Sequence, residues 1–149
     1  MKNYQTANVG PFQNLDNNVF APEGMPIKID GKLFLGDLVG LNSMEISLNK
    51  IAAGTGMNFF HRHNAHEEAY LFLSGEGEMS IDDEIIPVKE GSVVSVQPEA
   101  KRSWWNTGDS DLTYIVIQAP AGGMKAPGVS DGTLLEGTVP WVQITESVA

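Results

Sequence analysis

The chain has 149 residues, which fits one domain of ordinary size, and it contains no cysteine, so disulfides and thiolate metal sites are excluded. Its formal net charge of −10 argues against binding to nucleic acid or to an anionic membrane surface. Its first residues lack an apolar signal segment, and no run approaches the roughly 18 apolar residues of a membrane-spanning helix. We therefore expect a cytoplasmic protein without nucleic-acid or membrane partners.

The chain divides by composition into three parts. Residues 1–30 are rich in Asn and Pro and weakly patterned, which predicts an N-terminal arm that packs on the domain or on a partner subunit. Residues 31–120 are predicted to form a series of short strands separated by turns that contain Gly, Ser and Asp. Residues 121–149 return to Gly and Pro and are predicted to be a tail with a possible last strand at Trp141–Ile144.

The predicted strands show no helical periodicity, and their close spacing favours an all-β sandwich or barrel. In chain order they are Leu33–Val39, Met44–Ile51, Met57–His63, Glu68–Leu73, Glu78–Asp82, Glu84–Lys89, Ser92–Val96, Ser103–Asn106 and Leu112–Gln118.

All three histidines of the chain lie within residues 61–68. Because side chains alternate along a strand, His61 and His63 are expected to face one side and Arg62 the other. A carboxylate from the next strand would complete a two-histidine, one-carboxylate set that suits Fe(II), Mn or Zn. His66 is predicted to lie in the connecting loop outside this set, and Glu67 to face solvent.

The spacing of these residues resembles the first motif of the cupin superfamily. His61-X-His63 is followed after four residues by Glu68 and after six more by Gly75. The second motif is represented by Gly91, and then by Pro98, Arg102 and Asn106. The resemblance covers roughly residues 40–118 and implies a double-stranded β-helix, the cupin-type jelly-roll barrel.

The resemblance implies that His61, His63 and Glu68 ligate a divalent metal, with Fe, Mn, Ni and Zn as candidates. Arg102 stands where the family places a fourth ligand, a histidine. An inward-facing Arg102 would bring a permanent positive charge near the metal, or form an ion pair with Glu68. Alternatively, its guanidinium could bind the carboxylate or phosphate of a substrate, or lean out into solvent.

Strand alternation also predicts what surrounds these residues. Met57 and Phe59 are expected to face inward with the histidines, and Tyr70 and Phe72 with Glu68. Most of the aromatic residues are expected to fill the core, whereas Tyr70 has a hydroxyl that could meet a ligand. The strand Leu112–Gln118 is apolar on both faces, which favours a homodimer.

Two functions are compatible with these features. The first is a small-molecule metalloenzyme, similar to cupin dioxygenases or isomerases, with a small anionic substrate and with Arg102 and Tyr70 as catalytic residues. The second is a metal-free cupin that binds a small ligand without chemistry and contains an Arg102–Glu68 ion pair in its pocket.

Overall fold

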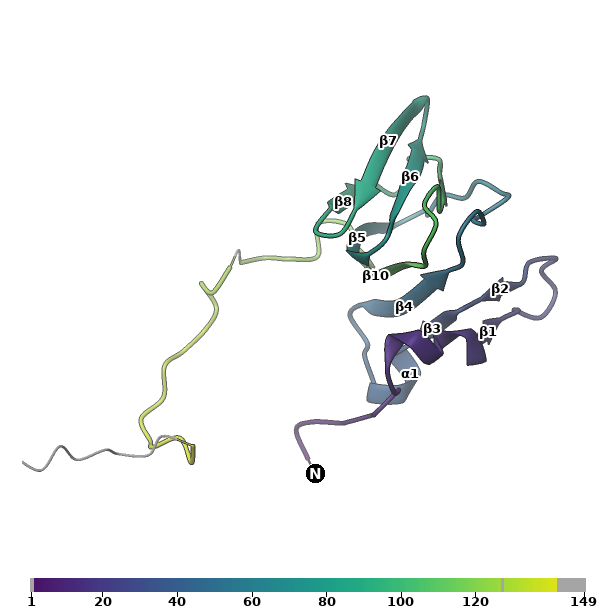
Figure 1. The fold of residues 1–149 in the computed structure, drawn as a ribbon. Coiled ribbons are helices and arrows are strands. Elements are labelled where there is room, and N and C mark those ends of the chain that lie inside the picture. Colours follow the sequence, from purple (N-terminus) through teal and green to yellow (C-terminus); the bar gives the residue numbers. More distant parts are fainter. Residues whose placement is uncertain (1, 127, 142–149) are drawn as a thin grey trace, which may run out of the picture.

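The computed structural model describes residues 2–126 and 128–141 and consists mainly of antiparallel strands (Figure 1). Its elements in chain order are η1 (Phe12–Asn17), β1 (Val19–Phe20), β2 (Ile29–Asp30), β3 (Lys32–Phe34), α1 (Gly36–Val39), β4 (Glu45–Ile51), β5 (His66–Ser74), β6 (Glu76–Ile81), β7 (Glu84–Lys89), β8 (Val93–Val96), β9 (Arg102–Trp105) and β10 (Leu112–Pro120). The prediction of an all-β protein is confirmed.

The strands form two sheets and a short hairpin. A five-stranded sheet has the order β3-β4-β10-β5-β8, a three-stranded sheet has the order β7-β6-β9, and β1 pairs with β2. Buried residues from both larger sheets make one core, so this core lies between them. Its members are Ile51, Tyr70, Phe72, Met79, Val88, Val96, Trp104, Leu112, Tyr114 and Val116.

Alternation along the strands decides which side chains enter this core. Leu112, Tyr114 and Val116 of β10 are all buried, and their β5 neighbours Tyr70 and Phe72 are buried opposite them. Successive residues of a strand face opposite sides, so every second residue of β5 and β10 packs inward. Glu68 continues the inward row of β5 and is also buried, which places a carboxylate at the edge of the core.

Gly75 separates β5 from β6 at a point where no other residue fits well. Its backbone has a φ of +80°, a conformation that residues with a side chain rarely adopt. A Cβ atom at this position would collide with the carbonyl oxygen of Asp111. The glycine therefore allows both the tight turn and the close approach of the neighbouring chain.

Two predicted strands differ from the structure. The segment predicted as Leu33–Val39 is instead the short strand β3 followed by helix α1, whose first amide, that of Gly36, donates to the Glu45 carboxylate at 2.7 Å. The segment Met57–His63 forms no regular strand and makes only isolated bridges, Gly56 with Trp105 and His61 with Arg102. The first prediction was wrong because local hydrogen bonds, from the amides of Val39 and Leu41 to the carbonyls of Leu35 and Gly36, close a helical turn. The second was wrong because this segment meets its distant partners only at isolated bridges.

The two ends of the described chain differ in their packing. Leu15 of η1 is 1% exposed, and the nearby Asp16 pairs with Lys50 of β4 at 2.6 Å. After β10 the chain leads away from the sheets (Figure 1). Of the last strand predicted at Trp141–Ile144, only Trp141 lies within the described residues. The described part of the chain has no helix that is long and apolar enough to cross a membrane.

Candidate metal centre and ligand cavity

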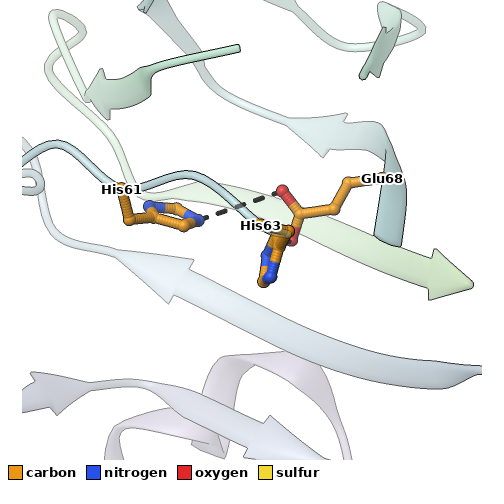
Figure 2. Close-up of side chains that lie close together, drawn as sticks. All are labelled: His61, His63 and Glu68. Atoms are coloured by element: carbon orange, nitrogen blue, oxygen red, sulfur yellow. Dashed lines mark hydrogen bonds and ion pairs between the residues drawn. The ribbon is translucent and has the colours of Figure 1, made fainter. Parts of the chain in front are cut away.

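His61, His63 and Glu68 converge although they come from different parts of the fold. Nε2 of His63 lies 3.0 Å from Oε1 of Glu68, and Nε2 of His61 lies 3.9 Å from Oε2. One ligand atom from each of the three residues falls within 4.8 Å of the others. Figure 2 shows the two imidazoles beside the Glu68 carboxylate. These three residues are called the His/Glu centre below.

Individual backbone hydrogen bonds hold the two histidines in place, although their segment is not part of a regular β-strand. The amide of His61 donates to the Arg102 carbonyl at 3.1 Å, and the amide of Arg102 donates back to the His61 carbonyl at 3.0 Å. The amide of His63 donates to the Pro98 carbonyl at 2.9 Å. Because the segment between them is extended, His61 and His63 face the same side as predicted, while Arg62 is exposed.

One oxygen of Glu68 accepts three hydrogen bonds. Its Oε2 accepts from the Tyr70 hydroxyl at 2.7 Å and from Nε and Nη2 of Arg102 at 3.0 and 2.8 Å. Burial alone would raise the pKa of Glu68, but the hydrogen bonds from Tyr70 and Arg102 outweigh it, and the net effect lowers the pKa. Glu68 is therefore a carboxylate with Oε2 fully engaged and Oε1 directed to His63.

Arg102 is wholly buried, with 0% of its surface exposed. Its Nη1 donates to the carbonyl oxygens of Pro98 and Ala100 at 3.1 and 2.7 Å. Together with its bonds to Glu68, these contacts occupy every nitrogen of the guanidinium with protein acceptors. Of the arrangements considered from the sequence, the geometry is that of the Arg102–Glu68 ion pair.

Tyr70 is also fully buried and donates its hydroxyl proton to Glu68. Burial, with a further contribution from the Glu68 charge, raises the pKa of Tyr70 well above its usual value. Tyr70 therefore stays protonated and acts on Glu68 as a hydrogen-bond donor.

The His61 imidazole has the properties that a metal ligand requires. Burial lowers the pKa of His61 to about 4, against the opposing effect of the Glu68 charge, so the ring is neutral at pH 7. Its Nδ1 is buried and has no hydrogen-bond partner within the described residues. Its Nε2 is too far from Glu68 for a hydrogen bond, so the ring retains a free lone pair for a cation.

The donor types and spacing of the His/Glu centre thus fit a divalent metal. Two imidazoles and one carboxylate suit Fe, Mn, Ni or Zn, and Glu68 could offer Oε1 while Arg102 and Tyr70 hold Oε2. Arg102 acts against the metal, because two unit charges about 4 Å apart interact by about 4 kcal/mol at an effective dielectric of about 20.

Two neighbouring residues stay outside this set. His66 is the first residue of β5 rather than a loop residue, is exposed, and has its Nδ1 3.3 Å from Oε1 of Gln118. Glu67 is partly exposed and points to the other face of β5 from Glu68. Neither belongs to the group whose ligand atoms converge.

The His/Glu centre lies in the wall of a cavity of about 270 Å³. Ligand pockets typically start at roughly 300 Å³, so the cavity suits a small molecule. Its lining is mostly apolar, with polar groups from several strands. The lining residues are Phe20, Met25, Ile27, Ile29, Lys32, Phe34, Ser47, Asn49, Met57, Phe59, His61, His63, Glu68, Tyr70, Trp104, Tyr114, Val116 and Gln118.

Several of these residues were not anticipated from the sequence. The N-terminal arm carries no predicted site residue, yet Phe20 and Ile29 of its hairpin contribute to the cavity wall. Lys32 is not among the site residues predicted from the sequence, and lysine side chains are mostly exposed in proteins. Strand alternation could have placed Lys32 in the site, because Lys32 and Phe34 are two residues apart and therefore lie on the same face of β3.

Comparison with known proteins supports the resemblance seen in the sequence. A family model described as a cupin domain matches residues 48–118. The crystal structure of a cupin protein from Bacteroides fragilis superposes with a TM-score of 0.75 and 31% sequence identity, covering 91% of this chain and 100% of that chain.

Two further relatives carry functional names. An oxalate-binding protein from Thermotoga maritima is 29% identical over 68 residues, which cover 46% of this chain and 55% of the relative. A putative sugar phosphate isomerase from Acidithiobacillus ferrooxidans has a TM-score of 0.53 and 32% identity, covering 59% of this chain and 57% of that chain.

The chain spans about half the length of the curated relatives it matches. The Bacteroides fragilis protein, in contrast, is matched over its whole length. The residues matched by the family model include the whole His/Glu centre. From these similarities and the two antiparallel sheets, we conclude that this chain belongs to the cupin superfamily and has its double-stranded β-helix fold.

Proposed function

We propose that this cupin is a small-molecule metalloenzyme in which His61, His63 and Glu68 hold a divalent Fe, Mn, Ni or Zn. The observation that supports this proposal is the convergence of three donor atoms within 4.8 Å in the wall of a mostly apolar cavity. A bound metal would act as a Lewis acid or activate water or O₂, chemistry compatible with an isomerase or a dioxygenase.

In this proposal the buried residues around Glu68 position it for the metal. Arg102 and Tyr70 hold Oε2, so that Oε1 remains directed toward His63. We thus assign to both residues the role of orienting the Glu68 carboxylate toward the metal. The substrate would bind on the cavity side of the metal. The names of the two relatives, an oxalate-binding protein and a putative sugar phosphate isomerase, support a small anionic compound as the substrate class.

Metal analysis tests the proposal. Protein purified without chelator should carry about one equivalent of metal, and Mn²⁺, Fe²⁺, Ni²⁺ or Zn²⁺ should raise the melting temperature of metal-free protein. His63→Ala should abolish both effects because it removes one of three ligands. His66→Ala is the matched control, since His66 is exposed and outside the His/Glu centre, and it should bind metal like the wild type. Absence of metal and of any thermal shift would refute the proposal.

A second function is favoured by a specific observation. Arg102 is fully buried against Glu68, and such a pair opposes a divalent cation at the same carboxylate. A metal-free cupin that binds a small ligand without chemistry would have this arrangement. It predicts no metal uptake, and ligand binding that does not change when metal is added or removed.

A further inference from the structure

We propose that Lys32 anchors the carboxylate of a small, largely apolar monocarboxylic acid in the cavity, with the rest of the ligand extending toward the His/Glu centre. This inference deepens the proposed function by naming the substrate class, and it rests on that function only for the chemistry that follows binding. Lys32 lines the same cavity as His61, His63 and Glu68.

The strand register builds a polar site around Lys32. Lys32 of β3 lies opposite Asn49 of β4, and Phe34 lies opposite Ser47, so these side chains share the inner face of the sheet. The Lys32 ammonium donates to Oδ1 of Asn49 at 2.9 Å and to Oγ of Ser47 at 3.1 Å. Asn49 and Ser47 are each 2% exposed, so the site is fixed by buried groups.

The ammonium is held in place but not neutralised. Both of its acceptors are uncharged, and within the described residues no carboxylate forms a salt bridge with it. An ammonium has three N–H donors, and two of them are used by Asn49 and Ser47. The third donor and the positive charge are available to a molecule in the cavity.

Asn49 is itself fixed as an acceptor toward Lys32. Its Nδ2 donates to the backbone carbonyl of Ser47 at 3.0 Å, which orients the amide with its oxygen toward the ammonium. The ring of Phe34 lies beside Lys32, with its centroid 4.7 Å from Nζ. The lysine is thus fixed in one direction before any ligand arrives, which lowers the entropic cost of binding.

A purely structural lysine would not be expected at this position. Burial lowers the pKa of Lys32 to about 8, although the negative charges of Glu68 and Glu45 act in the opposite direction. Keeping the ammonium charged in this place therefore lowers the stability of the folded protein. An apolar side chain of similar length would fill the same space without that cost. Retention of a cation in a mostly apolar cavity, beside the uncharged acceptors Asn49 and Ser47, indicates a negatively charged ligand.

The remaining lining defines the other features of the ligand. Besides Lys32 and the His/Glu centre, the wall contains the apolar side chains of Phe34, Met57, Phe59 and Val116, which favour an aliphatic or aromatic body. The volume of about 270 Å³ limits the ligand to a small acid. We assign the anion to Lys32 and not to Arg102, because Arg102 does not line the cavity and its guanidinium is paired with Glu68.

The test compares acids with their uncharged amides on metal-free protein at pH 7. We expect benzoate and hexanoate to bind the wild type, as measured by isothermal titration calorimetry, and benzamide and hexanamide to bind roughly tenfold more weakly or not at all. Lys32→Met should weaken binding of the acids by roughly tenfold or more and leave the amides unchanged. Lys32→Arg keeps the charge and should retain most of the affinity for the acids.

Lys28→Met is the matched control. It also removes one positive charge, but Lys28 is exposed, pairs with Asp30 and does not line the cavity, so affinity for the acids should remain at the wild-type value. Equal binding of acids and amides to the wild type, no binding of either acid, or full affinity in folded Lys32→Met protein would each overturn the inference. If Lys32→Met does not fold, the comparison of acid with amide on the wild type decides.

Failure of this inference can be told apart from failure of the proposed metal function. The binding test uses metal-free protein, whereas the metal test uses His63→Ala and no organic ligand. Acid binding without metal uptake would support Lys32 and favour the metal-free alternative. Metal uptake without a preference for acids would support the metal centre and reject the role of Lys32.

Discussion

Glu68 divides its two carboxylate oxygens between different kinds of partner. Oε2 accepts from Tyr70 and Arg102, whereas Oε1 faces His63 at 3.0 Å. Arg102 therefore has two opposite effects on a metal at this centre: it orients the carboxylate, and its charge repels the cation. The balance between these effects can be measured by changing Arg102 alone.

Arg102→His should tighten binding of Zn²⁺ or Mn²⁺ by about tenfold or more. The substitution removes a permanent charge and places an imidazole where the cupin family has its fourth ligand. In the absence of metal, the free energy of unfolding should fall by roughly 3 kcal/mol, because Glu68, Pro98 and Ala100 lose buried hydrogen bonds. Calorimetric titration with metal and urea unfolding measure the two effects.

Arg62→His provides the matched control, because Arg62 is exposed and lies between the two histidines. It should leave both metal affinity and stability close to wild type. Unchanged metal affinity in Arg102→His would show that the charge at position 102 does not limit metal binding.

Lys32 should make stability depend on pH in a defined direction. Its pKa is about 8 in the folded protein and 10.5 in the reference state, so the unfolded chain binds more protons between these values. The free energy of unfolding of the wild type should therefore rise from pH 8 to 10.5 relative to Lys32→Met. The charges of Glu68 and Glu45 raise the pKa of Lys32, and the Lys32 charge lowers the pKa of His61.

Urea unfolding of the wild type and Lys32→Met at pH 7 and pH 10 measures this difference, and other titrating groups such as Lys50 affect both proteins alike. Lys32→Met should be the more stable protein at pH 7, and its advantage should shrink at pH 10. A constant difference between the two proteins would show that Lys32 is not desolvated.

At the scale of elements, alternation of side chains predicted more of the site than strand assignment did. Met57, Phe59, His61 and His63 line the cavity as their spacing predicts, although residues 57–63 form no regular strand. An extended backbone is enough to alternate side chains, whereas a strand also needs a hydrogen-bonded neighbour. The local sequence predicts the extended backbone, but it does not show whether a neighbouring strand is present.

Other parts of the site depend on contacts that the local sequence does not contain. Arg102 was predicted to face inward as one of several alternatives, but only the fold shows that its guanidinium meets Glu68, 34 residues away. Lys32 enters the cavity because β3 pairs with β4 and places it opposite Asn49. Such pairings between distant segments decide which polar residues become buried.

Gly75→Ala should be strongly destabilising. The residue has a φ of +80°, and a Cβ atom would collide with the Asp111 backbone. Gly91→Ala is a matched control, since its φ is +84° but nothing lies within 4 Å of an added Cβ. We expect a loss of about 1 kcal/mol for Gly91→Ala and at least about 2 kcal/mol more for Gly75→Ala in urea unfolding. Equal losses would show that the Asp111 backbone moves aside.

At the scale of the whole molecule, the two ends of the described chain contribute differently to the site. Leu15 of the arm is buried, and the β1–β2 hairpin after it supplies Phe20 and Ile29 to the cavity. Leu134 and Leu135 of the C-terminal segment are 102% and 86% exposed. The arm thus belongs to the folded domain and the cavity, whereas the described part of the tail leaves large apolar side chains in solvent.

The same substitution at the two ends should give very different results. Leu15→Ala should lower the free energy of unfolding by roughly 2–4 kcal/mol, the usual cost of removing a buried leucine side chain, and Leu135→Ala should change it by less than about 0.5 kcal/mol. Urea unfolding measures both. A comparable loss for Leu135→Ala would mean that another surface covers this leucine in solution. If size-exclusion chromatography then showed a dimer that Leu135→Ala converts to a monomer, that surface would be a second copy of the chain.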